Sequence, residues 1–326
     1  MEFNGIINVY KEAGFTSFDV VAKLRGMLKV KKIGHTGTLD PEAVGVLPVC
    51  VGYATKICDL LTDATKEYVA TMRLGVETDT QDMTGSILNE YPVDENVLTD
   101  ERLLKAFEKF TGDIEQIPPM YSAIKVNGQK LYDLARKGIE VERKKRNVRI
   151  EEIELLNGFH NTANGPMIRF RVVCSKGTYI RSLCHDLGKE LGCGGAMEHL
   201  ERTRVGCFSS DNAYTLSSIQ TIVDESKLQT SDTVEDMNLK PLMDIIEPVD
   251  AIFSEYSALN VTHEGMKALN NGNQLQPEQI KEVNEGFKLR ARRVYRIYAE
   301  DGSFRALYEY HSGWKALKTV KVFSLE

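Results

Sequence analysis

The stretch KKIGHTGTLDPEAVGVLPVCVGYATK, residues 31–56, has two halves of different character. Its second half, VGVLPVCVG (44–52), is a continuous apolar run, which is typical of a strand buried on both faces. Its first half is polar and rich in glycine, and it carries one His and one Asp, so it fits neither a loose linker nor a core strand. The stretch therefore predicts a central strand that begins where a rigid loop, shaped around a substrate, ends.

The residues before this stretch predict a strand and an amphipathic helix. GIINVYK (5–11) has the composition of a short strand, and Ser17 can cap the N-terminus of the helix. Apolar residues recur at helical spacing at Val20, Val21, Leu24 and Leu28. The remaining face and the exit of the helix carry Lys23, Arg25, Lys29, Lys31 and Lys32. This basic set is either a solvated face or a set of phosphate contacts, and the sequence leaves both open.

Two further strands and two further helices have clear periodicities. EYVATMRLG (67–75) and MIRFRVVC (167–174) alternate as strands do. A helix from Thr99 to Phe110 is expected to turn Leu103, Phe107 and Phe110 inward, with Gly112 just past its end. A later helix has one apolar face and stops at Gly192; that face is Ile180, Leu183, Leu187 and Leu191. Strands dispersed among helices without regular alternation predict an α+β fold with a mixed sheet.

The texture of the chain changes near residue 246. VYRIYAEDGSFRALYEY (294–310) is two alternating runs around Asp301-Gly302, which predicts a hairpin with a type I′ turn. WKALKTVKVF (314–323) predicts a third strand. The sequence thus predicts two domains, residues 1–245 and residues 246–326, joined through the acidic stretch 211–250.

Composition limits the class of protein. The chain has 326 residues, 42% of them hydrophobic and 27% charged, as in ordinary globular proteins. No window approaches a membrane span, and the first residues do not resemble a signal peptide. The six cysteines include no C-x-x-C pair, so we expect reduced thiols, no zinc site and a cytoplasmic location.

The net charge of −6 hides an uneven distribution. Residues 121–210 hold 16 Lys+Arg against 10 Asp+Glu, and residues 281–326 hold 10 against 6. Residues 211–280, between them, hold 3 against 12. Because binding responds to local patches rather than to the total charge, a nucleic-acid partner is compatible with this sequence.

Several catalytic classes lack their motifs. The sequence contains no G-x-x-x-x-G-K-[ST], no G-x-G-x-x-G after a strand and no H-E-x-x-H, so we expect neither a nucleotide cofactor nor a metal. Cys184, His185 and Asp186 are neighbours on one helix, and adjacent helical residues do not face one another. They therefore do not form a catalytic triad.

Asp40 and Arg181 are the candidates for chemistry that the residues alone suggest. An Asp before Pro is most often a turn starter, yet Asp40 lies in a loop with Gly34, Gly37 and Gly45, where backbone can approach a ligand closely. Arg181 lies in the first turn of a helix, off its apolar stripe, and a buried arginine normally needs a carboxylate. The two side chains could form that pair, but spacing in the sequence does not show contact.

Four long blocks together carry a family resemblance. They are GHTGTLDPEAVGVLPVCVGYATK (34–56), KEYVATMRLGVETDTQD (66–82), GDIEQIPPMYSAIKVNGQKLYDLARKG (112–138) and CSKGTYIRSLCHDLG (174–188). They are similar to the signature blocks of the TruB-type tRNA pseudouridine synthases of the bacterial stand-alone type, and they stand in that family's order. The resemblance implies a mixed, largely antiparallel sheet with flanking helices in a catalytic domain (1–245). It also implies a small C-terminal β-rich, PUA-like RNA-binding domain (246–326).

The resemblance also implies an activity and a set of site residues. The activity is conversion of the uridine at position 55, in the T loop of tRNA, to pseudouridine without a cofactor. Asp40 matches the essential carboxylate, Arg181 the arginine that pairs with it, and Tyr68 the tyrosine that stacks on the target base. Tyr179 and Leu200 match positions that line the base pocket, and His35 matches the histidine that helps to open the T loop. An adjacent guanidinium would lower the pKa of Asp40 and keep it ionised.

Two other functions remain open at the level of sequence. One is the activity of a relative with another target, such as the guide-RNA-dependent dyskerin branch; the other is RNA binding or RNA folding without catalysis. The compact length favours the stand-alone enzyme over the dyskerin branch, and the presence of Asp40, Tyr68 and Arg181 argues against binding without catalysis. We expect it to act on the T stem-loop of tRNA as a monomer, with no protein partner and no membrane.

Overall fold

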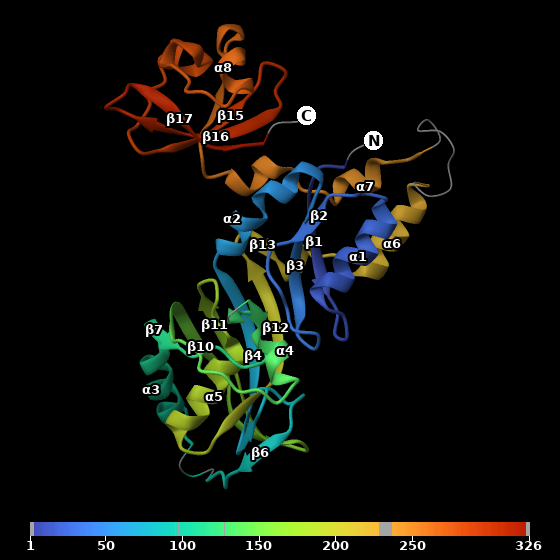
Figure 1. Cartoon of the computed structure of the whole chain (residues 1–326), viewed down its shortest axis with the longest axis vertical. Coiled ribbons are helices and arrows are strands. Elements are labelled where there is room, and N and C mark those ends of the chain that lie inside the picture. Colours follow the sequence, from blue (N-terminus) through green and yellow to red (C-terminus); the bar gives the residue numbers. More distant parts are fainter. Residues whose placement is uncertain (1–2, 95, 97, 127, 228–236, 324–326) are drawn as a thin grey trace.

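The computed structural model describes residues 3–94, 96, 98–126, 128–227 and 237–323, so part of the acidic connection (228–236) lies outside the described residues. A nine-stranded sheet forms the larger part of the molecule (Figure 1). Its main path is β1 (Gly5–Lys11), β3 (Val44–Val51), β12 (Gly195–Val205), β4 (Lys66–Leu74), β11 (Gly165–Cys174), β10 (Arg146–Thr162) and β7 (Gly112–Gln116). Only β3 and β12 pair in parallel along this path, so the predicted α+β fold with a largely antiparallel sheet is confirmed.

Shorter elements surround this path. β2 (Ile33–His35) pairs with β3, and β13 (Phe208–Ser209) pairs with β12. Two small hairpins are β5 (Val76–Thr78) with β6 (Ile87–Glu90) and β8 (Lys125–Val126) with β9 (Gln129–Lys130). The α-helices outside the C-terminal part are α1 (Ser17–Leu28), α2 (Cys58–Asp63), α3 (Asp100–Phe110), α4 (Leu131–Ala135), α5 (Ile180–Leu191), α6 (Leu216–Glu225) and α7 (Lys240–Asp244).

Ser17 was predicted to cap helix α1, but it is the first helical residue and Thr16 is the N-cap. The backbone of Thr16 is extended, and its side chain accepts a hydrogen bond from the backbone N–H of Asp19 at 3.1 Å. The Asp19 carboxylate in turn accepts a hydrogen bond from the backbone N–H of Thr16. The prediction of Ser17 as the cap is therefore wrong by one position, since the reciprocal pair of bonds is available only to Thr16. The predicted apolar stripe of α1 is buried against α6 and strands β1 and β3.

Helices α3 and α5 cover the other half of the sheet. Their apolar residues pack on one face of β4, β10 and β11 in a single cluster that contains Leu103, Phe107, Phe170, Leu183 and Leu187. Helix α3 begins one residue after its predicted start, α5 ends at the predicted Gly192, and Gly112 follows the end of α3 with a φ of +99°. The periodicity of these segments was sufficient to place them because each buries one continuous face.

The C-terminal part contains a second sheet of four strands. Its order is β14 (Ala258–Asn260), β15 (Val294–Tyr298), β16 (Phe304–His311) and β17 (Ala316–Val322), with α8 (Met266–Asn270) and α9 (Lys281–Asn284) beside it. The predicted hairpin is present, but its type I′ turn is wrong. Gly302 has a φ of +79°, whereas Asp301 is not among the residues with positive φ, and the N–H of Gly302 donates to the carbonyl of Ala299. A type I turn followed by a left-handed glycine meets the same sequence pattern.

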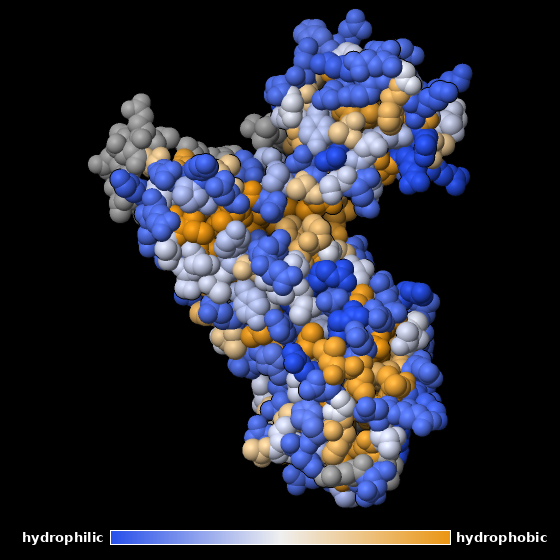
Figure 2. All heavy atoms as spheres, turned by 180° about the vertical axis from the view of Figure 1, so that it is seen from behind, coloured by the Kyte–Doolittle hydropathy of each residue, from blue (hydrophilic) through white to orange (hydrophobic). Residues whose placement is uncertain are grey.

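One apolar cluster joins the two sheets. It combines residues of β1, β3 and α2 with residues of the connecting segment and of the second sheet: Ile6, Val46, Cys50, Leu61, Val249, Phe253, Leu307 and Phe323. Ile6 and Glu247 also exchange two backbone hydrogen bonds of 2.8 Å. Seen from behind, apolar side chains gather at this junction (Figure 2). The division at residues 245 and 246 stays a prediction, and it falls just before the residues that bind β1.

Within the described ranges, every helix is too short or too polar to cross a membrane. The cytoplasmic location stays a prediction.

Candidate active site

The loop that carries Asp40 connects β2 to β3 of the large sheet. Leu39 and Ala43, on either side of Asp40, are buried in the apolar cluster beneath α5. The backbone N–H of Ala43 donates to the Asp40 carbonyl at 3.1 Å, which closes a tight turn. The loop is thus rigid because its apolar residues belong to the core while Asp40 points out of it.

Residues of the first strand and helix hold this loop from outside. The buried Lys11 Nζ donates to the carbonyl of Pro41 at 2.8 Å. The Ser17 hydroxyl accepts a hydrogen bond from the N–H of Leu39 at 2.9 Å. Burial lowers the pKa of Lys11 to about 8, against the raising effect of Glu42 and Asp40. Lys11 was not singled out in the sequence, because a lysine that ends a strand is usually exposed.

Arg181 and Asp40 form a two-point ion pair. Arg181 Nε lies 2.9 Å from Asp40 Oδ2, and Nη2 donates to Oδ1 at 3.2 Å. The Arg181 side chain is 7% exposed and that of Asp40 is 40% exposed. The contact that the sequence left open is therefore present, and the carboxylate presents its free side to solvent.

Arg181 also contacts three other groups. Nη1 lies 3.5 Å from Asp82 Oδ2 and donates to the carbonyl of Thr80 at 3.2 Å, and Nη2 donates to the carbonyl of Tyr121 at 2.9 Å. One guanidinium therefore joins α5 to three separate loops. Asp82 was missed from the sequence because TDTQD has the composition of an ordinary polar turn.

The surroundings of Asp40 have opposing effects on its pKa. Burial raises the pKa above its usual value, Arg181 lowers it, and the nearby Asp82 raises it again. The net direction is upward. Arg181 therefore lowers the pKa of Asp40 as expected, but burial raises it by more than the guanidinium lowers it.

Tyr68 and Tyr179 lie near this pair. Tyr68 lies on β4, opposite Arg202 of β12, and packs against the same apolar cluster as Leu39. Tyr179 precedes α5, and Gln116 fixes its backbone by accepting from its N–H at 2.8 Å and donating to its carbonyl at 3.0 Å. Burial raises the pKa of both hydroxyls, and the charge of Asp40 adds to the increase in each case.

Leu200 and His35 differ in their relation to Asp40. Leu200 is buried in the cluster that contains Leu39 and Ala43. His35 ends β2, and its Nδ1 accepts a hydrogen bond from the N–H of Gly37 at 3.3 Å. Burial lowers the pKa of His35, and the charge of Arg202 lowers it further. The structure thus pairs Asp40 with Arg181 and places Tyr68 and Leu200 in the apolar cluster beside the loop, while His35 lies at the start of the loop.

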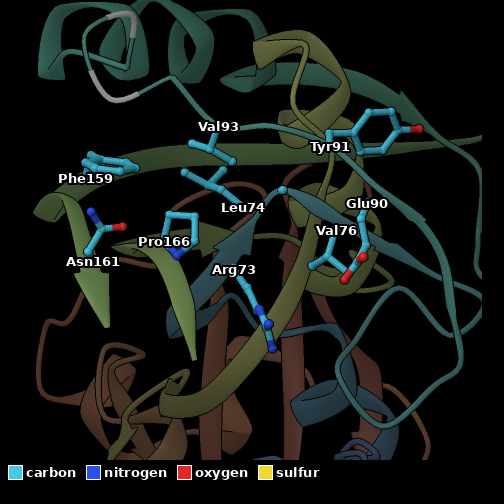
Figure 3. A pocket seen from close by; sticks show the side chains of 10 residues that line it. Arg73, Leu74, Val76, Glu90, Tyr91, Val93, Phe159, Asn161 and Pro166 are labelled. Carbon is cyan, nitrogen blue, oxygen red and sulfur yellow. The ribbon is translucent and has the colours of Figure 1, made fainter. Parts of the chain in front are cut away.

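A hollow of about 360 Å³ lies elsewhere, at the far end of β4 (Figure 3). Leu74 and Val93 lie side by side on its wall. Its other lining residues are Arg73, Gly75, Val76, Glu90, Tyr91, Phe159, Asn161 and Pro166. None of the predicted site residues lines it, so it is not part of the candidate site. Among the residues that the structure describes, no three His, Cys, Asp or Glu side chains gather as metal ligands would.

Comparisons with known proteins agree with this geometry. A family model described as TruB family pseudouridylate synthase (N terminal domain) matches residues 25–180. A second, tRNA pseudouridylate synthase B C-terminal domain, matches residues 181–254, so the four-stranded sheet lies beyond both matches. A tRNA pseudouridine synthase B of Lachnoclostridium phytofermentans is 48% identical over 98% of this chain and 99% of its own length. Its counterpart in Clostridium tetani is 41% identical over 97% and 99%.

Solved structures give the same result. The chain is similar to one in the crystal structure of a Cbf5-Nop10-Gar1 complex, with a TM-score of 0.67 and 28% identity over 98% of this chain and 85% of that one. It is also similar to a chain in the structure of an H/ACA RNP bound to a substrate RNA containing 2′-deoxyuridine, with a TM-score of 0.66 and 26% identity. Fold and sequence together define a pseudouridine synthase. Within that class, the chain belongs to the TruB family.

Proposed function

We propose that this enzyme converts the uridine at position 55, in the T loop of tRNA, to pseudouridine, and that Asp40 is its essential carboxylate. The curated relatives named above are tRNA pseudouridine synthases, which supports tRNA as the substrate. The observation that carries the proposal is the Asp40–Arg181 pair, whose carboxylate faces solvent beside Tyr68 and Tyr179.

The reaction neither transfers electrons nor adds a group, so a carboxylate in a pocket that excludes water can carry it out. The bond between C1′ and N1 of the base breaks and a bond between C1′ and C5 forms. The C5 hydrogen leaves as a proton and N1 takes up a proton, so the product is an isomer of the substrate. A carboxylate suits attack on a sugar carbon, since Asp and Glu form covalent intermediates there in other enzymes. Attack on C6 of the base, or removal of a sugar proton, is also open to Asp40.

The target base must leave the RNA stack before C1′ can be reached. Flipping costs a few kcal/mol. Stacking on an aromatic ring contributes about 1–3 kcal/mol per base, which offsets much of that cost. In this proposal Tyr68 stacks on the flipped uracil, Tyr179 and Leu200 line its pocket, and His35 occupies the space that the base vacates.

One assay tests the proposal directly. The purified protein alone is mixed with tRNA labelled with tritium at C5 of uridine, and the release of tritium and the modified position are measured. Release confined to position 55 supports the proposal. Modification that requires an added guide RNA or protein supports the dyskerin-like alternative instead. Binding or refolding of tRNA without release supports a role in RNA folding alone.

The C-terminal sheet adds a surface suited to RNA. Trp314 is 57% exposed, its ring stacks on His311 at 5.2 Å, and Lys318 Nζ lies 3.2 Å from its centre. Arg292 and Arg293 lie beside the end of β16 that precedes Trp314, because their backbone is hydrogen-bonded to that of Tyr310. Five cations of this part of the chain form no ion pair with a described residue: Arg290, Arg292, Arg293, Lys315 and Lys318. Aromatic rings among unpaired cations are typical of RNA-binding surfaces.

Trp314 gives a direct test of this C-terminal surface, because it is the only tryptophan in the sequence. We expect whole tRNA to quench its fluorescence and an isolated T stem-loop to leave it largely unchanged. Trp314→Ala is expected to weaken binding of whole tRNA about tenfold, since one stacked base is lost. Leu104→Ala, which changes an exposed apolar residue on α3, is the control. Equal quenching by both RNAs, or unchanged affinity of Trp314→Ala, would contradict the assignment.

The pKa of Asp40 predicts a pH dependence. The rate of a single turnover requires the ionised carboxylate, so the rate falls as pH drops through the pKa of Asp40. Because burial raises that pKa, the fall is expected at a higher pH than the usual value of about 4. Asp82→Asn removes a charge that raises the pKa of Asp40, so the fall should move to lower pH. Asp113→Asn, at an exposed site, should not move it. A shift of the Asp82→Asn profile to higher pH would refute this account.

A further inference from the structure

Arg202 carries a buried charge that has no role in the proposed reaction as described so far. It lies on β12, between β3 and β4, with Gly45 as its neighbour on one side and Tyr68 on the other. Its side chain is 1% exposed. A Cβ at Gly45 would lie 2.2 Å from the Arg202 carbonyl oxygen, so the glycine at position 45 permits this close approach. The alternating sequence ERTR gave no sign that one of its two arginines lies inside.

The guanidinium of Arg202 holds both ends of the catalytic loop. Nε donates to the carbonyl of Val46 at 2.7 Å, and Nη2 donates to the carbonyl of Gly37 at 3.2 Å. Gly37 precedes Asp40 and Val46 follows it, so the two bonds draw the loop together around the carboxylate. A guanidinium has five N–H donors, and these bonds use two of them.

The charge of Arg202 is not neutralised by any carboxylate of the described residues. The other buried arginine, Arg181, pairs with Asp40 and Asp82, and Arg204 on the same strand pairs with Glu67. Burying a charge without an acidic partner is costly. Two carbonyls could be held by neutral donors at a lower cost. The positive charge therefore requires a reason other than the loop.

Tyr68 supplies that reason. Tyr68 lies directly opposite Arg202 on the neighbouring strand β4. Burial raises the pKa of its hydroxyl, while the charge of Arg202 lowers it. The charge of Arg202 also lowers the pKa of His35 and of the buried Lys11 and Lys66, in each case after the larger effect of burial. Of Tyr68, His35, Lys11 and Lys66, we single out Tyr68, because its hydroxyl could accept a hydrogen bond from an unused N–H of Arg202 while its ring faces the substrate.

We propose that Arg202 is a positioning residue that fixes the Tyr68 hydroxyl against the target uridine while it clamps both ends of the loop that carries Asp40. This role rests on the proposed function, because it acts on the same bound uridine. It adds a second buried arginine to the site: Arg181 orients the carboxylate, and Arg202 orients the tyrosine.

The test is a double-mutant cycle under single-turnover conditions with saturating enzyme and T-arm RNA. Arg202→Gln keeps polar donors and loses the charge and the fork. We expect the rate to fall about hundredfold, because small misplacements near the reacting atoms cause losses of this size. RNA affinity should stay within about threefold of the wild-type value. In a Tyr68→Phe background the same substitution should have much less effect, because the hydroxyl through which it acts is gone. The control is Arg204→Gln, whose pair with Glu67 is partly exposed and contributes little.

A second measurement does not depend on turnover. With tyrosines labelled with carbon-13 at the ring carbon that bears the hydroxyl, the Tyr68 signal is the one of 13 that Tyr68→Phe removes. Arg202→Gln should shift that signal strongly. If Arg202→Gln does not fold, Arg202→Lys, which keeps the charge, should shift it less and lower the rate at least about tenfold.

The outcomes separate this inference from the proposed function. Equal losses in the wild-type and Tyr68→Phe backgrounds, or a Tyr68 signal unmoved in both Arg202 variants, would overturn the role of Arg202. Neither result bears on whether the wild-type protein modifies position 55. A wild-type protein inactive on T-arm RNA would overturn the proposed function, while the shift of the Tyr68 signal would still report the contact.

Discussion

Asp40→Asn is expected to abolish pseudouridine formation while tRNA affinity stays within about tenfold, or ~1.4 kcal/mol. Asparagine has nearly the same shape and its amide oxygen can still accept from Arg181, so the loop should keep its position. The lost charge is the one that the proposed chemistry needs. Tritium release at saturating enzyme measures the rate, and filter binding measures the affinity.

Two results would refute this role of Asp40. Turnover close to that of the wild type would show that the carboxylate is not essential. A large loss of affinity with the single-turnover rate preserved would show that Asp40 shapes the RNA-binding surface instead. Asp113→Asn serves as the control, because Asp113 lies in an exposed pair with Arg149 on β7 and β10.

Arg181→Lys is the second substitution with a large expected effect. Lysine keeps the positive charge but has one compact ammonium in place of a planar fork. It cannot reach Asp40 at two points and also contact Asp82 and the carbonyls of Thr80 and Tyr121. We expect the single-turnover rate to fall at least about hundredfold, because Asp40 would no longer be held in one orientation. We also expect a lower melting temperature, since the side chain is buried and joins four segments.

The competing account makes Arg181 a phosphate contact. It predicts weaker RNA binding and a normal single-turnover rate once enzyme is saturating. Measuring that rate over a range of enzyme concentrations separates the two accounts. Lys189→Arg, which changes a cation in the last turn of the same helix, should leave both quantities near their wild-type values.

Much of the fold could be predicted because its elements bury continuous faces. The strand at 44–51 and the helix at 180–191 show their burial directly in their sequence patterns. The cap could not be resolved because Thr16 and Ser17 are both good capping residues, and the turn at Gly302 could not because Asp-Gly fits two turn geometries. Asp40 could be found because its loop combines polar residues with glycines beside a core strand.

Asp82 and Arg202 were harder to find than Asp40 and Arg181. They reach the site only through the pairing of β12 with β4 and through the path of the loop after β5. Such contacts join residues that are far apart in the sequence and depend on strand order and register. No local pattern carries that information. The direction of the Asp40 pKa shift has the same origin, since the burial that raises it is created by loops distant in sequence.

The apolar cluster between the two sheets has a consequence for the order of folding during synthesis. Phe323, which follows β17, is fully buried in the same cluster as Ile6 of the first strand. Strands β1 and β3, which flank the Asp40 loop, therefore lack part of their apolar cover until the second sheet has been made. Domains usually fold in order as they emerge. Here a segment from much later in the chain completes the support of the first strand, so the sheet that carries Asp40 cannot finish its core before the second sheet is synthesised.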